Sequence, residues 1–166
     1  MNICIVYGST TGTTESVANV IAEKLGVADV YDVNSMDADV IAAHDVLVLG
    51  TSTWGDGELQ DDWYEGVNVL KGADLSGKKV ALFGCGDSES YCDTFCDGMS
   101  ALYEALQGTG CTFVGGGVDA ADYSFSSSKS VVDGKFVGLA IDDMNESDKT
   151  EDRVSAWVEA LEAELA

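Results

Sequence analysis

The chain has 166 residues, of which 46% are apolar, and this composition indicates one folded domain of ordinary size. Thirty acidic residues oppose eight basic ones, so the formal net charge is −22. That charge excludes nucleic acids and anionic membrane surfaces as partners, because both are bound through Lys and Arg, and it favours a protein partner with a basic face.

Hydropathy and cysteine content indicate where the protein works. No apolar run reaches the ~18 residues that a membrane span needs, and residues 1–7, MNICIVY, lack the basic region of a signal peptide. The five cysteines follow no disulfide or metal-binding spacing, and the one histidine, His44, is expected on the surface near the start of a strand. We therefore expect no metal site and a reducing, cytoplasmic compartment. We also expect a monomer.

Short apolar runs alternate with amphipathic segments along the chain. The apolar runs predict strands buried on both faces of a sheet, at 3–7, 30–33, 46–49, 80–83 and 112–114. Apolar residues at helical spacing predict helices, over 13–25, 61–70, 95–106 and 154–165, the last of which begins at a cap at Asp148 or Thr150. Alternating strands and helices are connected by right-handed crossovers onto a parallel sheet, so we predict an α/β fold with three layers, doubly wound around five parallel strands.

The segment from about 121 to 143 breaks this alternation. It contains a Ser-rich stretch and then the apolar pairs Val131-Val132 and Phe136-Val137, separated by Asp133-Gly134-Lys135. An Asp-Gly pair between apolar residues is typical of a tight β-hairpin. We expect this segment to be an insertion within or beside the fifth strand.

Three of the predicted strands end in loops rich in glycine and hydroxyl side chains. These loops are 8–14, 50–57 and 84–91. In an open parallel sheet, ligands bind beyond the carboxyl ends of the strands, at the point where the strand order reverses. If strands one, three and four are neighbours, the three loops meet at a single ligand site.

The first loop carries hydroxyls at Ser9, Thr10, Thr11, Thr13 and Thr14 and opens a predicted helix. Backbone N–H groups at a helix start bind phosphate well, and the hydroxyls add neutral donors. The GxxxxGK[ST] and GxGxxG patterns are both absent, and no Lys or Arg lies nearby, which argues against a nucleoside triphosphatase and a dinucleotide fingerprint. Simple capping of the helix explains the same residues about equally well.

Two aromatic residues, Trp54 and Tyr91, follow the other two strand ends. Either one alone is more typical of core packing or an interface. Together, beside a phosphate loop, they favour a flat ring system held between two aromatic side chains, and thus a mononucleotide. The acidic residues of these loops are interpreted mainly as a solvated face, namely Asp56, Glu58, Asp61, Asp62, Asp87, Glu89 and Asp93.

These segments resemble the flavodoxin family over the whole chain. Residues 9–14, STTGTT, match its phosphate loop (S/T)-x-T-G-x-T, with Thr13 where Asn is common. Residues 53–63 resemble the loop around the inner flavin-stacking Trp, and 84–97 resemble the loop with the outer stacking Tyr. Residues 123–139 are similar to the insertion of long-chain flavodoxins.

The resemblance implies a single flavodoxin-like domain over 1–166, with strand order 2-1-3-4-5. It also implies one non-covalently bound FMN and low-potential one-electron transfer, from a reductase donor to a low-potential acceptor with basic docking faces, without substrate turnover. The residues that it places at the cofactor are Ser9, Thr10, Thr11, Gly12, Thr13, Thr14, Ser52, Thr53, Trp54, Gly55, Asp56, Gly57, Cys85, Gly86, Asp87, Tyr91 and Cys96.

By position in the family motifs, the residues 9–14 would hold the phosphate, while Trp54 and Tyr91 would stack on the inner and outer ring faces. The Gly55–Asp56 peptide would face the flavin N5, and residues 85–87 would contact the pyrimidine edge. Two alternatives stay open. An FMN-dependent NAD(P)H:quinone or azo reductase should have an open pocket and positive charge over the flavin, and a flavin-free signalling receiver needs an Asp at a strand end and an opposed Lys.

Overall fold

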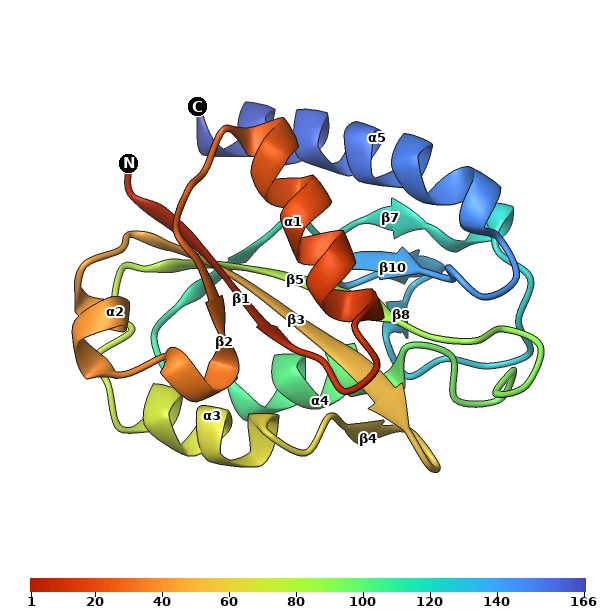
Figure 1. Ribbon diagram of the computed structural model, residues 1–166, viewed down its shortest axis with the longest axis horizontal. Coiled ribbons are helices and arrows are strands. Elements are labelled where there is room, and N and C mark those ends of the chain that lie inside the picture. Colours follow the sequence, from red (N-terminus) through yellow and green to blue (C-terminus); the bar gives the residue numbers. More distant parts are fainter.

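The computed structural model describes all 166 residues, and its helices lie in two layers on either side of a central sheet (Figure 1). One face is covered by α1 (Thr13–Leu25) and α5 (Ser147–Leu165). The other is covered by α2 (Ala38–Ala42), α3 (Trp63–Lys71) and α4 (Asp97–Ala105). The predicted three-layer α/β architecture is therefore confirmed, and α2 is an additional short helix.

The central sheet is parallel, with its strands in the order β10-β5-β3-β1-β2. Its inner strands are β1 (Ile3–Gly8), β3 (Val46–Trp54) and β5 (Lys79–Cys85), and β2 (Val30–Asp32) lies at one edge. Strands β1, β3 and β5 are neighbours, so the loops that follow them lie at the same edge of the sheet. A short strand, β4 (Glu58–Leu59), pairs antiparallel with the end of β3.

Two short strands share the fifth position of the predicted order. β6 (Thr112–Val114) pairs with the first half of β5, and β10 (Leu139–Ile141) pairs with its second half. The structure's β5 is the fourth strand of the prediction, and β6 and β10 together form the fifth. Numbered in this way, the order is 2-1-3-4-5, as predicted. Residues 139–141, near the end of the expected 121–143 segment, form β10 and belong to the central sheet.

Residues 115–138 leave the sheet between β6 and β10 and form a small antiparallel sheet in the order β7-β9-β8. Its strands are β7 (Val118–Asp119), β8 (Val131–Val132) and β9 (Lys135–Phe136), and the 3-10 helix η2 (Ala120–Asp122) follows β7. Asp133 and Gly134 have φ values of 53° and 79°. This is the left-handed backbone of the tight hairpin turn predicted from the Asp-Gly pair.

Side chains of β3 alternate between the two layers of the core. Leu47 and Leu49 belong to the cluster under α3 and α4, whereas Val46 and Val48 belong to the cluster under α1 and α5. Trp63 is fully buried, and its indole Nε1 donates a hydrogen bond to the carbonyl oxygen of Gly50 over 2.7 Å. This bond attaches α3 to the middle of β3.

The expectation that His44 lies on the surface is wrong. Its ring is buried, with Nδ1 2.7 Å from the carbonyl oxygen of Val40 and Nε2 2.9 Å from Asp29 Oδ2. The histidine therefore fixes the chain that enters β3 to α2 and to the residue before β2. None of the helices combines the length and the apolar character needed to cross a membrane.

Candidate functional site

A cavity of about 250 Å³ lies where the carboxyl ends of β1, β3, β5 and β10 meet. The expected site residues that line it are Thr11, Thr13, Ser52, Thr53, Trp54, Cys85, Gly86, Asp87 and Tyr91. Thr94 and Met144 line it as well and were not predicted from the sequence. Met144 follows β10, the strand that the sequence pattern assigned to the insertion.

The remaining expected residues surround this cavity without lining it. Ser9, Thr10, Gly12 and Thr14 belong to the same first loop and helix start as the lining residues Thr11 and Thr13. Residues 55–57 form the turn beyond Trp54, between β3 and β4. Cys96 is fully buried at the start of α4, so its side chain does not reach the cavity.

The first loop, beside the cavity, contains hydrogen-bond donors that have no partner within the protein. Gly12 precedes α1 with φ 96°, its N–H donates to Ser9 Oγ over 3.0 Å, and no side chain caps the helix. The first N–H groups of a helix have no partners within it, and they carry the positive end of the helix dipole. Thr14 is fully buried, and its hydroxyl has no hydrogen-bond partner. A buried, unpaired hydroxyl is unfavourable unless an acceptor binds there, so the loop fits an anionic group.

A buried glutamine joins the first loop to the second. Gln60 Nε2 donates to Thr10 Oγ1 over 3.2 Å and to Asp62 Oδ2 over 2.9 Å, and its backbone N–H donates to Thr51 Oγ1. Sequence reasoning missed Gln60 because its partner in the first loop, Thr10, lies far away in the chain. Through these hydrogen bonds, Gln60 ties the first loop at Thr10 to β3 at Thr51.

Trp54 is the last residue of β3, which extends beyond its predicted end at residue 49, and 40% of its surface is exposed. Its indole Nε1 donates to Ser52 Oγ over 2.8 Å, and the turn behind it closes through Gly57 N–H to the Trp54 carbonyl over 3.1 Å. Gly55 and Gly57 have φ values of 53° and 96°, a left-handed backbone that favours glycine. The turn therefore holds a large aromatic side chain at the cavity with little packing against the core.

The third loop is organised by the carboxylate of Asp87. Asp87 Oδ1 accepts hydrogen bonds from the backbone N–H groups of Ser90 (2.9 Å) and Glu89 (3.1 Å), and these bonds, led by that of Ser90, lower the pKa of Asp87. The Tyr91 N–H donates to the Asp87 carbonyl over 2.9 Å. Tyr91 is 51% exposed and lines the cavity that Trp54 also lines. The two aromatic side chains therefore line the same cavity.

Comparison with known proteins identifies the family. The family model for flavodoxin matches residues 5–157. The chain belongs to the flavodoxin family. It is 43% identical to "Flavodoxin" of Klebsiella pneumoniae, with 98% of this chain and 94% of that protein covered, and 42% identical to "Flavodoxin 1" of Escherichia coli (strain K12), with 97% and 93% covered.

Solved structures agree with this assignment. The crystal structure of Fusobacterium nucleatum flavodoxin bound to flavin mononucleotide aligns with a TM-score of 0.90 and 29% identity, and 99% of each chain is covered. Flavodoxins are electron-transfer proteins rather than enzymes that turn over a substrate. The resemblance and the fold class predicted from the sequence are therefore confirmed.

The two cysteines among the expected site residues of this flavodoxin are buried thiols. Burial raises the pKa of Cys85 to about 12, and burial also raises the pKa of Cys96 well above its ordinary value. Both are therefore protonated and unreactive at neutral pH. Cys96 lies beneath Gly86, where a Cβ would come within 2.9 Å of the Cys96 nitrogen, so the glycine lets the third loop lie close against α4. No group of three or more His, Cys, Asp or Glu residues is arranged to hold a metal ion.

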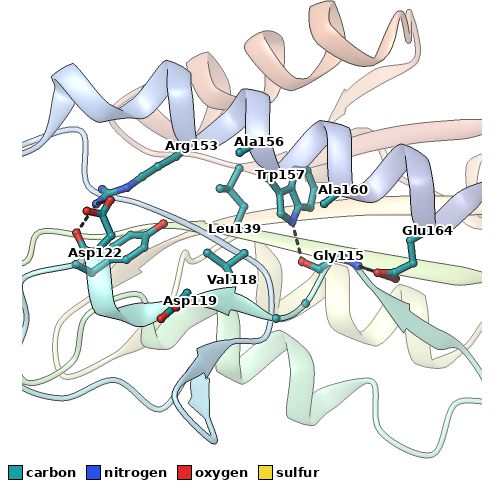
Figure 2. Close-up of a pocket in the computed structure, with 13 residues that line it drawn as sticks. Gly115, Val118, Asp119, Asp122, Leu139, Arg153, Ala156, Trp157, Ala160 and Glu164 are labelled. Atoms are coloured by element: carbon teal, nitrogen blue, oxygen red, sulfur yellow. Dashed lines mark hydrogen bonds and ion pairs between the residues drawn. The ribbon is translucent and has the colours of Figure 1, made fainter.

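A larger cavity, of about 310 Å³, lies between α5 and residues 115–123 (Figure 2). At its wall, Trp157 Nε1 donates to the Gly115 carbonyl over 2.7 Å, and the Gly115 N–H donates to Glu164 Oε2 over 3.1 Å. None of the residues expected at the flavodoxin site line this cavity. It also lacks the loop hydroxyls and the paired exposed aromatics of the smaller cavity, so size alone does not mark the functional site.

Proposed function

We propose that this flavodoxin carries electrons one at a time between redox proteins through one FMN, bound non-covalently at the cavity beyond β1, β3 and β5. The observation that carries the proposal is the combination of unpaired donors at the start of α1 with two exposed aromatic side chains at the same cavity. FMN supplies the capacity to accept and release single electrons, which the side chains of the protein do not have.

The residues around the cavity fit the parts of FMN. The hydroxyls of residues 9–14 and the free N–H groups of α1 suit the phosphate, and Thr14 supplies the buried hydroxyl that lacks an acceptor. Trp54 and Tyr91 suit the two faces of the ring system. Backbone groups of residues 85–87, which also line the cavity, suit its pyrimidine edge.

The same residues favour a low reduction potential. Trp54 and Tyr91 exclude water from the ring faces, and a charged group in a dry environment loses solvation. In water, each carboxylate at ~10 Å repels an added negative charge by about 0.4 kcal/mol before salt screening. With a net charge of −22, the protein makes the last electron unfavourable to add. The surroundings therefore make the reduced carrier a strong electron donor.

The reductase alternative is not favoured. An NAD(P)H-dependent enzyme needs positive charge for the nicotinamide phosphates, and no Lys or Arg lines the cavity. Tyr91, which lines the cavity, would cover the ring face that a hydride donor must approach. Redox proteins with basic faces suit the acidic surface, which includes the exposed Asp61, Glu65 and Asp93 close to the site in sequence.

The same proposal includes a monomer of one domain, with residues 115–138 as its insertion. The protein works in a reducing compartment such as the cytoplasm, where its five free cysteines stay reduced.

The experiment is a titration of apoprotein with FMN, riboflavin and FAD, followed by quenching of flavin fluorescence. We expect one FMN per chain and an affinity for riboflavin at least about a hundredfold lower, because riboflavin lacks the phosphate and its charge-assisted hydrogen bonds. Equal affinity for riboflavin, or preference for FAD, would contradict the proposal. NADPH and a quinone, added without a reductase, should give no turnover above background.

A further inference from the structure

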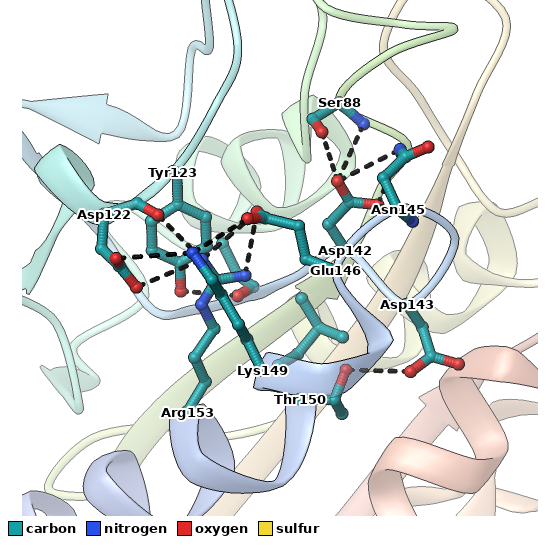
Figure 3. Close-up of polar contacts among 12 residues, drawn as sticks. Ser88, Asp122, Tyr123, Asp142, Asp143, Asn145, Glu146, Lys149, Thr150 and Arg153 are labelled. Carbon is teal, nitrogen blue, oxygen red and sulfur yellow. Dashed lines mark hydrogen bonds and ion pairs between the residues drawn. The ribbon is translucent and has the colours of Figure 1, made fainter.

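The turn after β10, residues 142–146, contacts the third loop of the site (Figure 3). We call residues 86–91 of that loop the outer loop, because Tyr91 lies at its end. The expected insertion, residues 121–143, included only the first two residues of this turn, and none of its residues was predicted at the site. In the structure, two of its side chains, Asp142 and Asn145, hydrogen-bond to residues of the outer loop.

Asp142 is a buried acidic residue that forms no ion pair with any Lys, Arg or His. Its carboxyl group instead accepts hydrogen bonds from the Ser88 hydroxyl, the Ser88 N–H (3.3 Å), the Asn145 N–H (3.1 Å) and the Asn145 side-chain amide. Burying such a group without partners is strongly unfavourable. The two segments that supply the donors, the outer loop and the turn, are therefore held together at Asp142.

Asn145 connects two acidic residues. Its Nδ2 lies 2.8 Å from Asp87 Oδ1 and 3.1 and 3.2 Å from the two carboxyl oxygens of Asp142. The amide has two N–H groups, so it can donate to both residues at once. Without it, the carboxyl groups of Asp87 and Asp142 would face each other with no donor between them. The carboxyl group of Asp87 accepts hydrogen bonds from the backbone N–H groups of Glu89 and Ser90, and its backbone carbonyl accepts one from Tyr91. Asp87 therefore orders the outer loop.

The turn itself is fixed from its other side by α5 and the insertion. Arg153 lies 3.2 Å from Glu146 Oε1 and 3.4 Å from Asp122 Oδ2, and its guanidinium stacks 3.8 Å above the ring of Tyr123. Figure 3 shows these contacts beside those of Asn145. The turn therefore has a rigid support, and Asn145 links that support to the outer loop.

We propose that Asn145 is a positioning residue of the cofactor site: its amide holds Asp87 and thereby keeps the outer loop and Tyr91 in place over the cofactor. This inference rests on the proposed FMN function. Asn145 does not line the cavity, so its effect on the cofactor is exerted through Asp87. Loss of the amide lets the outer loop open, so that the cofactor leaves faster and water reaches the ring face that Tyr91 covers.

The test compares Asn145→Ala with Thr150→Ala. The control removes a hydrogen bond of the same turn, from Thr150 Oγ1 to Asp143 Oδ1 at 2.9 Å, that involves neither Asp87 nor Asp142. We expect FMN to dissociate from Asn145→Ala about three- to tenfold faster, the range for loss of one hydrogen bond. The reduction potential for the second electron should rise in the same variant, because water stabilises added charge. Thr150→Ala should match the wild type in both measurements.

A third readout does not need the cofactor. In the apoprotein, the backbone N–H groups of Ser90 and Tyr91, both bonded to Asp87, should exchange with deuterium faster in Asn145→Ala than in the wild type or Thr150→Ala. Asn145→Asp, which puts a third carboxylate between two others, should accelerate FMN release further. If the wild type binds FMN but Asn145→Ala changes neither FMN release nor deuterium exchange, this inference is overturned while the proposed function stands. Faster exchange with unchanged release and potential would reduce the contact to a structural one and overturn it too. A wild type that binds no FMN would overturn the proposed function and this inference with it.

Discussion

Trp54 and Ser52 are joined by a hydrogen bond of 2.8 Å, from the indole Nε1 to the serine Oγ, although 40% of the tryptophan surface is exposed. Both residues belong to β3, and both line the cavity. An exposed aromatic side chain would otherwise sample several rotamers. The bond holds the ring ready for the cofactor, which lowers the entropy lost on binding.

Ser52→Ala removes this bond and should weaken FMN binding by about three- to tenfold, since a neutral hydrogen bond contributes about 1 kcal/mol. Titration of the apoprotein with FMN measures the effect. In NMR spectra of the apoprotein, the indole N–H signal of Trp54 should move while those of Trp63 and Trp157 stay. Ser124→Ala, at an exposed position of the insertion, is the control. Unchanged affinity together with an unmoved Trp54 signal would show that the bond has no role.

Tyr91→Ala should weaken FMN and raise the reduction potential for the second electron. Stacking of a base on an aromatic side chain contributes about 1–3 kcal/mol, and we expect a loss of affinity in that range. Water admitted to the ring face stabilises the added negative charge and so raises the reduction potential. The potential shifts by roughly 60 mV for each tenfold change in the relative affinity of the protein for the two redox states. Tyr64→Ala is a matched control, because Tyr64 on α3 is exposed to a similar extent, 52%. A potential that falls, or that both variants shift equally, would contradict the placement of Tyr91 at the cofactor.

Thr14→Val should have opposite effects on the apoprotein and on cofactor binding. The hydroxyl is buried without a partner, so its removal should stabilise the apoprotein by about 1 kcal/mol in urea unfolding. FMN should bind about tenfold more weakly, because the phosphate loses one charge-assisted donor. An apoprotein that becomes less stable while FMN affinity stays the same would mean that this hydroxyl serves the fold and not the phosphate.

Charge reversal tests where partners dock. Three exposed acidic residues close in sequence to the two aromatic loops, Asp61, Glu65 and Asp93, are replaced by Lys. The triple variant should accept electrons from a reductase more slowly, and the rate should depend less on salt. The matched control places Lys at Asp152, Glu159 and Glu162 on the exposed face of α5, with the same change in net charge. Stopped-flow measurements across a salt series compare the variants. Equal flattening by both would show that total charge, and not a surface beside the cofactor, governs recognition.

Local sequence patterns predicted the elements that are specified by residues close together in the chain. The apolar spacing of residues 13–25 predicts α1 with the bounds that the structure shows, because this helix packs on the sheet through one face of its own. The Asp133-Gly134 pair predicts the hairpin turn, since both residues have the left-handed backbone that this turn requires. The convergence of three glycine- and hydroxyl-rich loops followed from the parallel sheet itself.

Features that depend on distant contacts were not predictable in this way. β10 has only three residues and is separated from β6 by the insertion, so nothing local assigns Leu139–Ile141 to the central sheet. Missing β10 also meant missing the turn after it, with Met144 at the cavity and Asn145 at Asp87. Gln60 and His44 were missed for the same reason, because their roles come from partners elsewhere in the chain.

The measurement that tests the central claim most directly is a stepwise reductive titration of the purified holoprotein, followed by visible absorbance against a set of redox mediators. If the protein is a one-electron carrier, one FMN per chain takes up two electrons in two separate steps, and the second step lies at a clearly lower potential than the first. Uptake of both electrons in a single step, or a protein that holds no FMN, would contradict the account.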